Sequence, residues 1–167
     1  MALLQLKQRY PHYEQFADED SKIVFESFEV YTGVGDRVGA VQDVLMDEQA
    51  GCIRYLIVDA GKCILIPMGV VRFDYDSHRI YVDGLKQQQI DTLPEYKNQS
   101  AISQDYEEMV RKVFRPMVIR RGSQPGNTLF DRNTYQYEQD SALYTLAGPD
   151  KQRLEQCEQQ LTSHRGQ

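Results

Sequence analysis

Short runs of β-branched and aromatic residues recur between residues 28 and 82, and Gly, Asp and Pro separate them at intervals of about ten residues. The runs cover residues 29–31, 37–46, 53–58, 63–66, 70–75 and 79–82. The run 53–58 holds one charged residue among six, so both faces of its strand should be covered and the strand should be central. Six strands this short cannot make a two-layer sandwich of the usual size. We therefore predict an all-β fold, a small six-stranded barrel that is closed or nearly closed.

The segments on either side of this region lack the strand pattern. Residues 1–25 mix apolar and polar types without a sustained period, which favours an irregular lead-in. Residues 85–94 predict one short helical turn that plugs an end of the barrel. The sequence thus predicts three parts: the irregular segment 1–25, a barrel domain 26–97 that folds by itself, and an extension 98–167.

The extension is expected to contain two helices joined by an arm. Ser103 can cap a helix from residue 104 to about residue 114, because apolar residues recur there at helical spacing. Pro116 and later loop-forming residues favour an extended arm over residues 115–145. A C-terminal helix is expected after Pro149.

Each predicted helix carries an apolar stripe that a small, filled barrel does not obviously cover. The stripe of the first helix consists of Tyr106, Met109, Val110 and Val113. The narrower stripe of the C-terminal helix consists of Leu154, Cys157 and Leu161. We expect these stripes to pack on a second subunit, which predicts a homodimer or a larger assembly.

Four short motifs follow one another in the barrel region. They are residues 39–47 (GAVQDVLMD), 53–59 (IRYLIVD), 64–67 (ILIP) and 81–85 (YVDGL). In this order they resemble the PRC-barrel family, which is named for the cytoplasmic domain of the photosynthetic reaction centre H subunit and includes a domain of the ribosome maturation factor. Residues 106–116 and the tyrosine-rich residues 130–146 resemble the C-terminal extension of the cyanobacterial members.

The resemblance implies a fold rather than a chemistry. It implies a non-enzymatic protein-interaction or scaffold module, associated with the photosynthetic membrane or a stress response, and its partner protein is not identified. The alternative implied by the same family is an RNA- or ribosome-associated factor, like the PRC-barrel of the ribosome maturation factor.

The residues themselves point to no catalytic, metal or cofactor site. The three histidines are scattered without metal-ligand neighbours, and the three cysteines have no C-x-x-C spacing. No nucleophile motif such as G-x-S-x-G occurs. We therefore expect no enzymatic activity, no metal and no cofactor.

Charge gives one candidate binding segment. The net charge of -6 argues against a chain-wide attraction to nucleic acid or anionic lipid. Residues 111–121 reverse this sign locally, since they hold five basic residues and no acidic one: Arg111, Lys112, Arg115, Arg120 and Arg121. These cations either favour the dipole at a helix C-terminus or form a docking segment for an acidic protein, an anionic membrane face or RNA. Both interpretations stay open at this point.

The expected location is the cytoplasm. No stretch approaches the roughly 18 apolar residues that a membrane span needs. The N-terminus alternates leucine with polar residues and builds no apolar signal core. Peripheral contact with the thylakoid or plasma membrane is compatible with this location.

Overall fold

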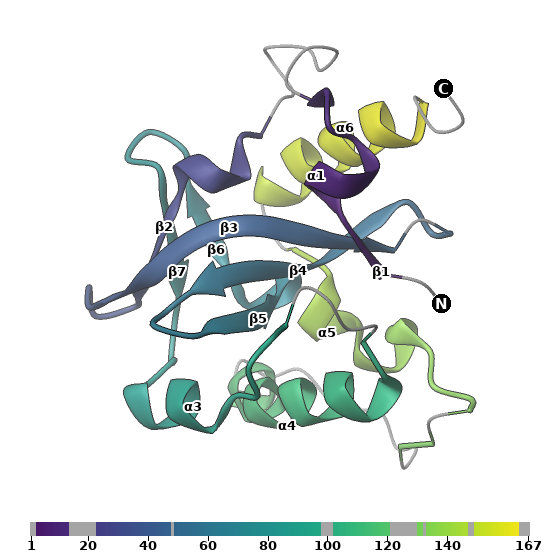
Figure 1. The fold of residues 1–167 in the computed structure, drawn as a ribbon. Coiled ribbons are helices and arrows are strands. Elements are labelled where there is room, and N and C mark those ends of the chain that lie inside the picture. The colour runs from purple at the N-terminus through teal and green to yellow at the C-terminus, as the bar shows by residue number, and fades with distance from the viewer. Residues whose placement is uncertain are drawn as a thin grey trace.

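The computed structural model of the chain describes residues 3–13, 23–47, 49–97, 102–120, 130–131, 133–146 and 149–163, apart from the side chains of residues 119, 120 and 149. In this part of the chain a strongly bent sheet lies between two groups of helices (Figure 1). Helices α1 (Leu6–Arg9) and α6 (Pro149–Ser163) lie above the sheet in this view. Helices α3 (Gln87–Thr92), α4 (Gln104–Arg120) and α5 (Ser141–Tyr144) lie below it.

Six of the described strands fall in the predicted runs, and β1 (Leu3–Gln5) lies in the segment that was predicted to be irregular. The six are β2 (Glu29–Thr32), β3 (Arg37–Asp47), β4 (Cys52–Asp59), β5 (Cys63–Pro67), β6 (Arg72–Asp74) and β7 (Arg79–Val82). Their order in the sheet is β5-β4-β3-β2-β7-β6, and β1 pairs with β3 outside this path. The β2–β7 pair is parallel and the other pairs are antiparallel.

The predicted barrel is correct only in part, because the sheet is mixed and does not close. The terminal strands of the order, β5 and β6, do not pair with each other. Strand β3 is long enough to pair with β2 along its first half and with β1 along its second half. Its register shifts mark β-bulges, which bend a strand and increase its twist. The sheet therefore curls around its core without an edge-to-edge seam.

Gly39 lies beside one of these bulges. A Cβ atom at this position would lie 2.0 Å from the carbonyl oxygen of Asp59 on the neighbouring strand. Only glycine allows the two backbones to approach so closely.

Groups outside the strand ladder bind backbone groups along the sheet. The backbone N–H of Tyr96 donates to the carbonyl of Cys63 on β5 at 2.7 Å. On β6, the N–H of Phe73 donates to the carboxylate of Asp150 at 3.0 Å. An open sheet exposes such backbone groups at its ends, and these bonds satisfy some of them without closing a barrel.

Two parts that we predicted to be irregular are partly regular. Residues 1–25 include β1 and the short helix α1 (Leu6–Arg9), which the carboxylate of Asp43 holds by accepting the backbone N–H of Lys7 at 3.3 Å. Within residues 115–145, the 3-10 helix η3 (Tyr137–Asp140) and the helix α5 (Ser141–Tyr144) replace part of the predicted arm.

Helix α4 (Gln104–Arg120) is also longer than predicted, because it continues through Pro116. A proline removes the N–H that would bond the carbonyl four residues earlier, here that of Lys112. Both residues are exposed, so water can satisfy this carbonyl. Phe114 and Met117 are buried on the opposite side, and their burial extends the helix past the proline.

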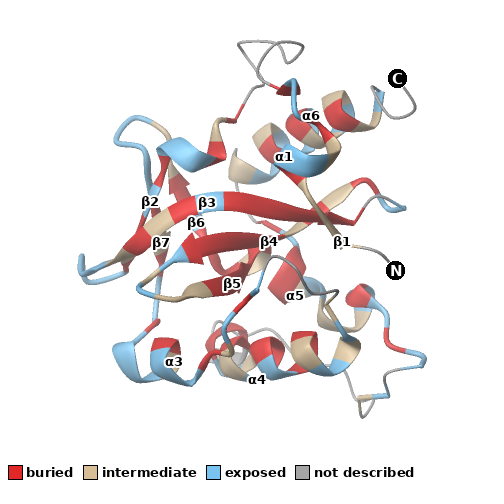
Figure 2. Cartoon of the chain, viewed as in Figure 1, coloured by how far each residue is buried: buried red, intermediate tan, exposed pale blue. Residues whose placement is uncertain are grey.

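The helices complete the core, as the red bands on their inner faces show (Figure 2). The remaining ones are η1 (Phe25–Ser27), η2 (Met68–Val70), α3 (Gln87–Thr92) and α6 (Pro149–Ser163). The predicted turn at residues 85–94 contains α3, whose Ile90 is buried. Because many of the described residues are helical, the predicted all-β class fits the sheet region but fits the chain as a whole only loosely. No described helix has the length and apolar character needed to cross a membrane.

Candidate functional site

The structure does not place the predicted basic segment on one surface. Arg111 is completely buried, and the side chain of Arg115 is 25% exposed. Lys112 is exposed. The side chain of Arg120 and the whole of Arg121 lie outside the described residues. The prediction that residues 111–121 form a docking surface is therefore wrong for Arg111, because its charged side chain is buried inside the fold.

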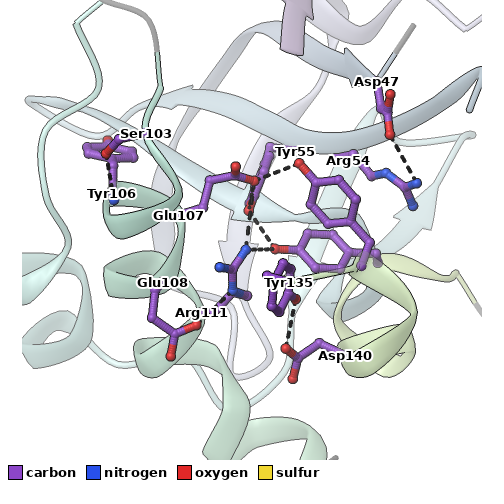
Figure 3. Close-up of polar contacts among 12 residues, drawn as sticks. Asp47, Arg54, Tyr55, Ser103, Tyr106, Glu107, Glu108, Arg111, Tyr135 and Asp140 are labelled. Atoms are coloured by element: carbon purple, nitrogen blue, oxygen red, sulfur yellow. Dashed lines mark hydrogen bonds and ion pairs between the residues drawn. The ribbon is translucent and has the colours of Figure 1, made fainter. Parts of the chain in front are cut away.

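Arg111 belongs to a buried ion cluster on α4 (Figure 3). Its Nε donates to Glu108 at 3.0 Å, and its guanidinium lies 3.7 Å from the centre of the Tyr135 ring. Arg115 donates to both oxygens of Glu108, at 2.5 and 2.8 Å, and to both oxygens of Asp140, at 2.9 and 3.0 Å. The two arginines thus tie α4 to the segment that begins at Tyr135.

Buried tyrosines extend this cluster to the sheet. The hydroxyls of Tyr55 on β4 and Tyr137 both donate to one oxygen of Glu107, at 2.9 and 2.8 Å. Tyr55 also shares a hydrogen bond with the hydroxyl of Tyr144, which accepts one from Arg111 at 3.3 Å. These bonds join β4, α4 and α5 into one polar contact inside the fold.

The pKa values of Glu107 and Glu108 shift in opposite directions, because the two carboxylates have different partners. Burial raises the pKa of Glu107 above its ordinary value, although Tyr137, Tyr55 and Arg111 oppose this shift. Burial acts in the same direction on Glu108, but hydrogen bonds from Arg115 and Arg111 hold its pKa below the ordinary value. The cluster's side chains are engaged with one another, so their arrangement supports a structural role. The spacing of Glu107 and Arg111, four residues apart on a helix, was the signal for such a pair in the sequence.

The apolar stripes that predicted an oligomer are largely covered by the chain itself. Leu154, Cys157 and Leu161 of α6 are buried, and Cys157 shares a hydrogen bond of 3.0 Å with the Tyr13 hydroxyl. On α4, Val110 is fully buried. Tyr106 and Val113 are partly buried against the core, and Met109 is 53% exposed. The argument for a second subunit on these stripes therefore no longer holds.

Helix α6 is also bound to the sheet by Glu158. Its carboxylate accepts the backbone N–H of Ile53 at 2.7 Å. Burial raises the pKa of Glu158 to about 7, and the Ile53 N–H and the charge of Arg54 only partly oppose this. Because the ordinary pKa is 4.5, the folded chain binds a proton here more tightly than the unfolded chain does.

We expect the stability contributed at Glu158 to be complete below about pH 4.5 and to be lost as the pH rises through about 7. The loss should be on the order of 1–3 kcal/mol. The measurement is urea unfolding of the wild type and of Glu158→Gln, which stays neutral, on both sides of this range. A stability difference between the two proteins that does not change with pH would contradict the assignment.

An open groove of about 380 Å³ lies between α1 and η1 and is a second candidate site. Asp43 lines it, and the ion pair of Lys7 and Glu26 (2.7 Å) lies on its wall. Both carboxylate oxygens of Asp43 accept backbone N–H groups, from Lys7 and Val44, so the residue anchors α1. Among the described residues no group of three or more His, Cys, Asp or Glu side chains is placed to hold a metal ion.

The outer face of β2, β7 and β6 has a different character. Along each strand buried residues alternate with half-buried or exposed ones. The pairing registers align Arg72 with Tyr81, Tyr81 with Tyr31, and Tyr31 with Arg37. The outward side chains there form what we call the tyrosine–arginine face: Glu29, Tyr31, Arg37, Arg72, Arg79, Tyr81 and Asp83.

Stacking orders the arginines of this face. The guanidinium of Arg72 lies 4.7 Å from the centre of the Tyr81 ring, and that of Arg79 lies 4.5 Å from the centre of the Tyr31 ring. The two rings lie 6.1 Å apart. Tyrosine and arginine are enriched at the centres of protein interfaces, and stacking reduces the entropy lost when they are bound.

Our sequence reasoning missed this face, although a signal was present. The sequences of β2 and β7, EVYT and RIYV, each place a charged residue and a tyrosine two positions apart, on the same side of a strand. Only the parallel pairing of β2 with β7, which the sequence did not indicate, brings the two tyrosines together.

Comparison with known proteins supports the family. The model described as PRC-barrel domain matches residues 25–89, which include β2 to β7. An uncharacterized protein of Deinococcus radiodurans is 36% identical over 86 residues, a match that covers 48% of this chain and 31% of that protein. The matched region thus spans about a third of the relative's length. The PRC-barrel family predicted from the four motifs is thus confirmed for residues 25–89.

Proposed function

Residues 25–89 belong to the PRC-barrel family, and from this premise we propose that the chain is a non-enzymatic protein-interaction or scaffold module. The observation that carries the proposal is the tyrosine–arginine face, on which two half-buried tyrosines lie between stacked arginines. A partner that covers this face would bury aromatic surface around arginines that are already ordered.

The charge of the face favours a protein over RNA or a membrane as the partner. Arg72 donates two hydrogen bonds to Asp83, at 3.2 and 3.3 Å. Arg37 pairs with Glu29 at 3.5 Å. Since carboxylates lie between the cations, the face does not offer the continuous positive potential that a phosphate backbone requires. Within the described parts of the chain, this face therefore gives no support to the alternative of an RNA- or ribosome-associated factor.

The cellular setting that we propose comes from the resemblance alone. It is a cytoplasmic protein of the cyanobacterial type, in peripheral contact with a photosynthetic membrane or active in a stress response. A homo-oligomer also stays a proposal, and the tyrosine–arginine face is the surface on which we would place it.

The test of the proposed function is a comparison of matched surface variants. We expect Tyr31→Ser/Tyr81→Ser to lose the proteins that crosslink to the wild type in lysate of the cells that produce the chain. The control is Val34→Ser/Met109→Ser, which removes two large exposed apolar side chains outside the face and should keep these proteins. Recovery of the same proteins by the tyrosine variant would disprove the role of the face, provided that all three proteins unfold at similar temperatures.

A further inference from the structure

We infer that the partner places a single carboxylate side chain on Arg79 of the tyrosine–arginine face, within a protein surface that is otherwise neutral or basic. The inference rests on the proposed function and adds the chemistry by which the partner is recognised. It follows from the contacts of the three arginines on this face and from the charge of the whole chain.

Arg79 differs from the other two arginines in its contacts. Arg72 is held by Asp83, and Arg37 by Glu29. No ion pair joins Arg79 to a carboxylate among the residues that the structure describes, and its guanidinium is held by the Tyr31 ring and by a hydrogen bond with the Tyr81 side chain. A partner that covers the face would therefore bury two paired cations and one whose charge is not paired.

The carboxylates opposite Arg79 on the two neighbouring strands attract it electrostatically, but neither forms an ion pair with it and both hydrogen-bond other groups. Asp74 is the register partner of Arg79 on β6, and it accepts the backbone N–H of Ser77 at 3.3 Å. Glu29 is its register partner on β2, and it accepts hydrogen bonds from Arg37 at 3.5 Å and from the Tyr31 hydroxyl at 3.1 Å. Burying Arg79 without an anion would cost free energy, so the partner has to supply one.

The surroundings of Arg79 select a carboxylate over a phosphate. Glu29 and Asp74, the register partners of Arg79 on the two neighbouring strands, place negative charge beside the site, which would repel a phosphate of charge near -2 more strongly than a carboxylate of charge -1. The planar guanidinium matches the planar carboxylate and can donate two parallel hydrogen bonds to it.

The net charge of the chain limits the rest of the partner. At -6 the chain repels a strongly acidic surface over distances comparable with the screening length. A partner with one acidic residue opposite Arg79, and apolar residues above the rings of Tyr31 and Tyr81, satisfies both the local and the long-range requirement.

The experiment selects binders for the full chain from a random peptide library. We expect enriched peptides to share one Asp or Glu at a fixed position beside apolar residues. Their binding to Arg79→Gln should weaken about ten- to a hundredfold, as expected for loss of a charged hydrogen bond. Arg79→Lys keeps the charge and should keep the acidic preference at lower affinity. Lys112→Gln, which removes an exposed cation of α4 outside the face, is the charge-matched control and should bind within a factor of about three.

The outcomes separate the inference from the proposed function. Peptides that need Tyr31 and Tyr81 but share no acidic residue would overturn the inference alone. The same holds if replacing the acidic residue by phosphoserine strengthens binding. If Tyr31→Ser/Tyr81→Ser binds every enriched peptide as the wild type does, the face is not a docking surface, and both the proposed function and the inference fail.

Discussion

A chain that ends at residue 97 is expected to lose cooperative unfolding, although it keeps every strand of the sheet. The strand pattern alone predicted that residues 26–97 fold by themselves. The contacts of the extension favour the opposite result, because helices α4, α5 and α6 cover apolar surface of the sheet and bind polar groups on it.

The extension also makes a close backbone contact with η2, through α5. A Cβ atom on Gly69 would lie 2.3 Å from the carbonyl oxygen of Ala142, so the two backbones touch with no side chain between them. Leu143 beside it is fully buried. The shortened chain would expose this apolar surface and leave the buried hydroxyl of Tyr55 without Glu107 and Tyr144.

The measurement is thermal unfolding followed by circular dichroism, together with binding of a dye that reports exposed apolar surface. We expect a broad, non-cooperative transition and strong dye binding for the chain that ends at residue 97. A chain that ends at residue 146 lacks only α6 among the described helices and should unfold cooperatively at a lower temperature than the wild type. A sharp transition of the shorter chain near that of the wild type would show that the extension is dispensable.

Replacing Arg111 by methionine is expected to lower the free energy of unfolding by about 3–5 kcal/mol, the range found when one partner of a buried ion pair is removed. Arg111 is completely buried and contacts both Glu107 (3.8 Å) and Glu108 (3.0 Å). Without it, Glu107 keeps its tyrosine donors but loses the nearest positive charge of α4.

The matched control is Lys112→Met, because Lys112 is the next residue on the same helix and is exposed. Its effect should stay within about 0.5 kcal/mol. The double variant Glu107→Gln/Arg111→Met should recover part of the lost stability, since the glutamine oxygen can still accept both tyrosine hydroxyls without a buried charge. Urea unfolding of the four proteins tests this. A loss below about 1 kcal/mol for Arg111→Met would mean that water reaches this cluster.

There is a physical reason why the five cations of residues 111–121 do not share one surface. In the sequence, Arg111 and Lys112 are neighbours with the same charge. On a helix, adjacent residues point about 100° apart, so one is fully buried while the other faces solvent. A helical pattern can indicate this difference, but the partners of Arg111 at Tyr135 and Tyr144 lie in a segment that looked like an arm.

The strands were predictable from the sequence by itself because their signal is local. Alternating apolar residues and turn-forming residues define β2 to β7 within one or two residues, apart from the longer run predicted at β6, and four motifs in this region indicate the family. The same local pattern placed Ile57 and Val58 in the core, where both are buried. The sequence predicted that Leu154 and Cys157 of α6 would be covered, but it assigned the cover to a second subunit instead of to the chain itself.

Tertiary structure alone decided which elements meet. The sheet stays open because other segments bind its backbone groups, as Asp150 does on β6, and such bonds join residues far apart in the chain. The parallel pairing of β2 with β7 brings Tyr31 beside Tyr81 and leaves Arg79 stacked without an ion pair among the described residues. Local periodicity specifies which side of a strand a residue occupies. Which residues lie beside it depends on the free energy of burying the apolar surface of the whole chain. That free energy sets the pairing of β2 with β7, and this pairing assembles the tyrosine–arginine face.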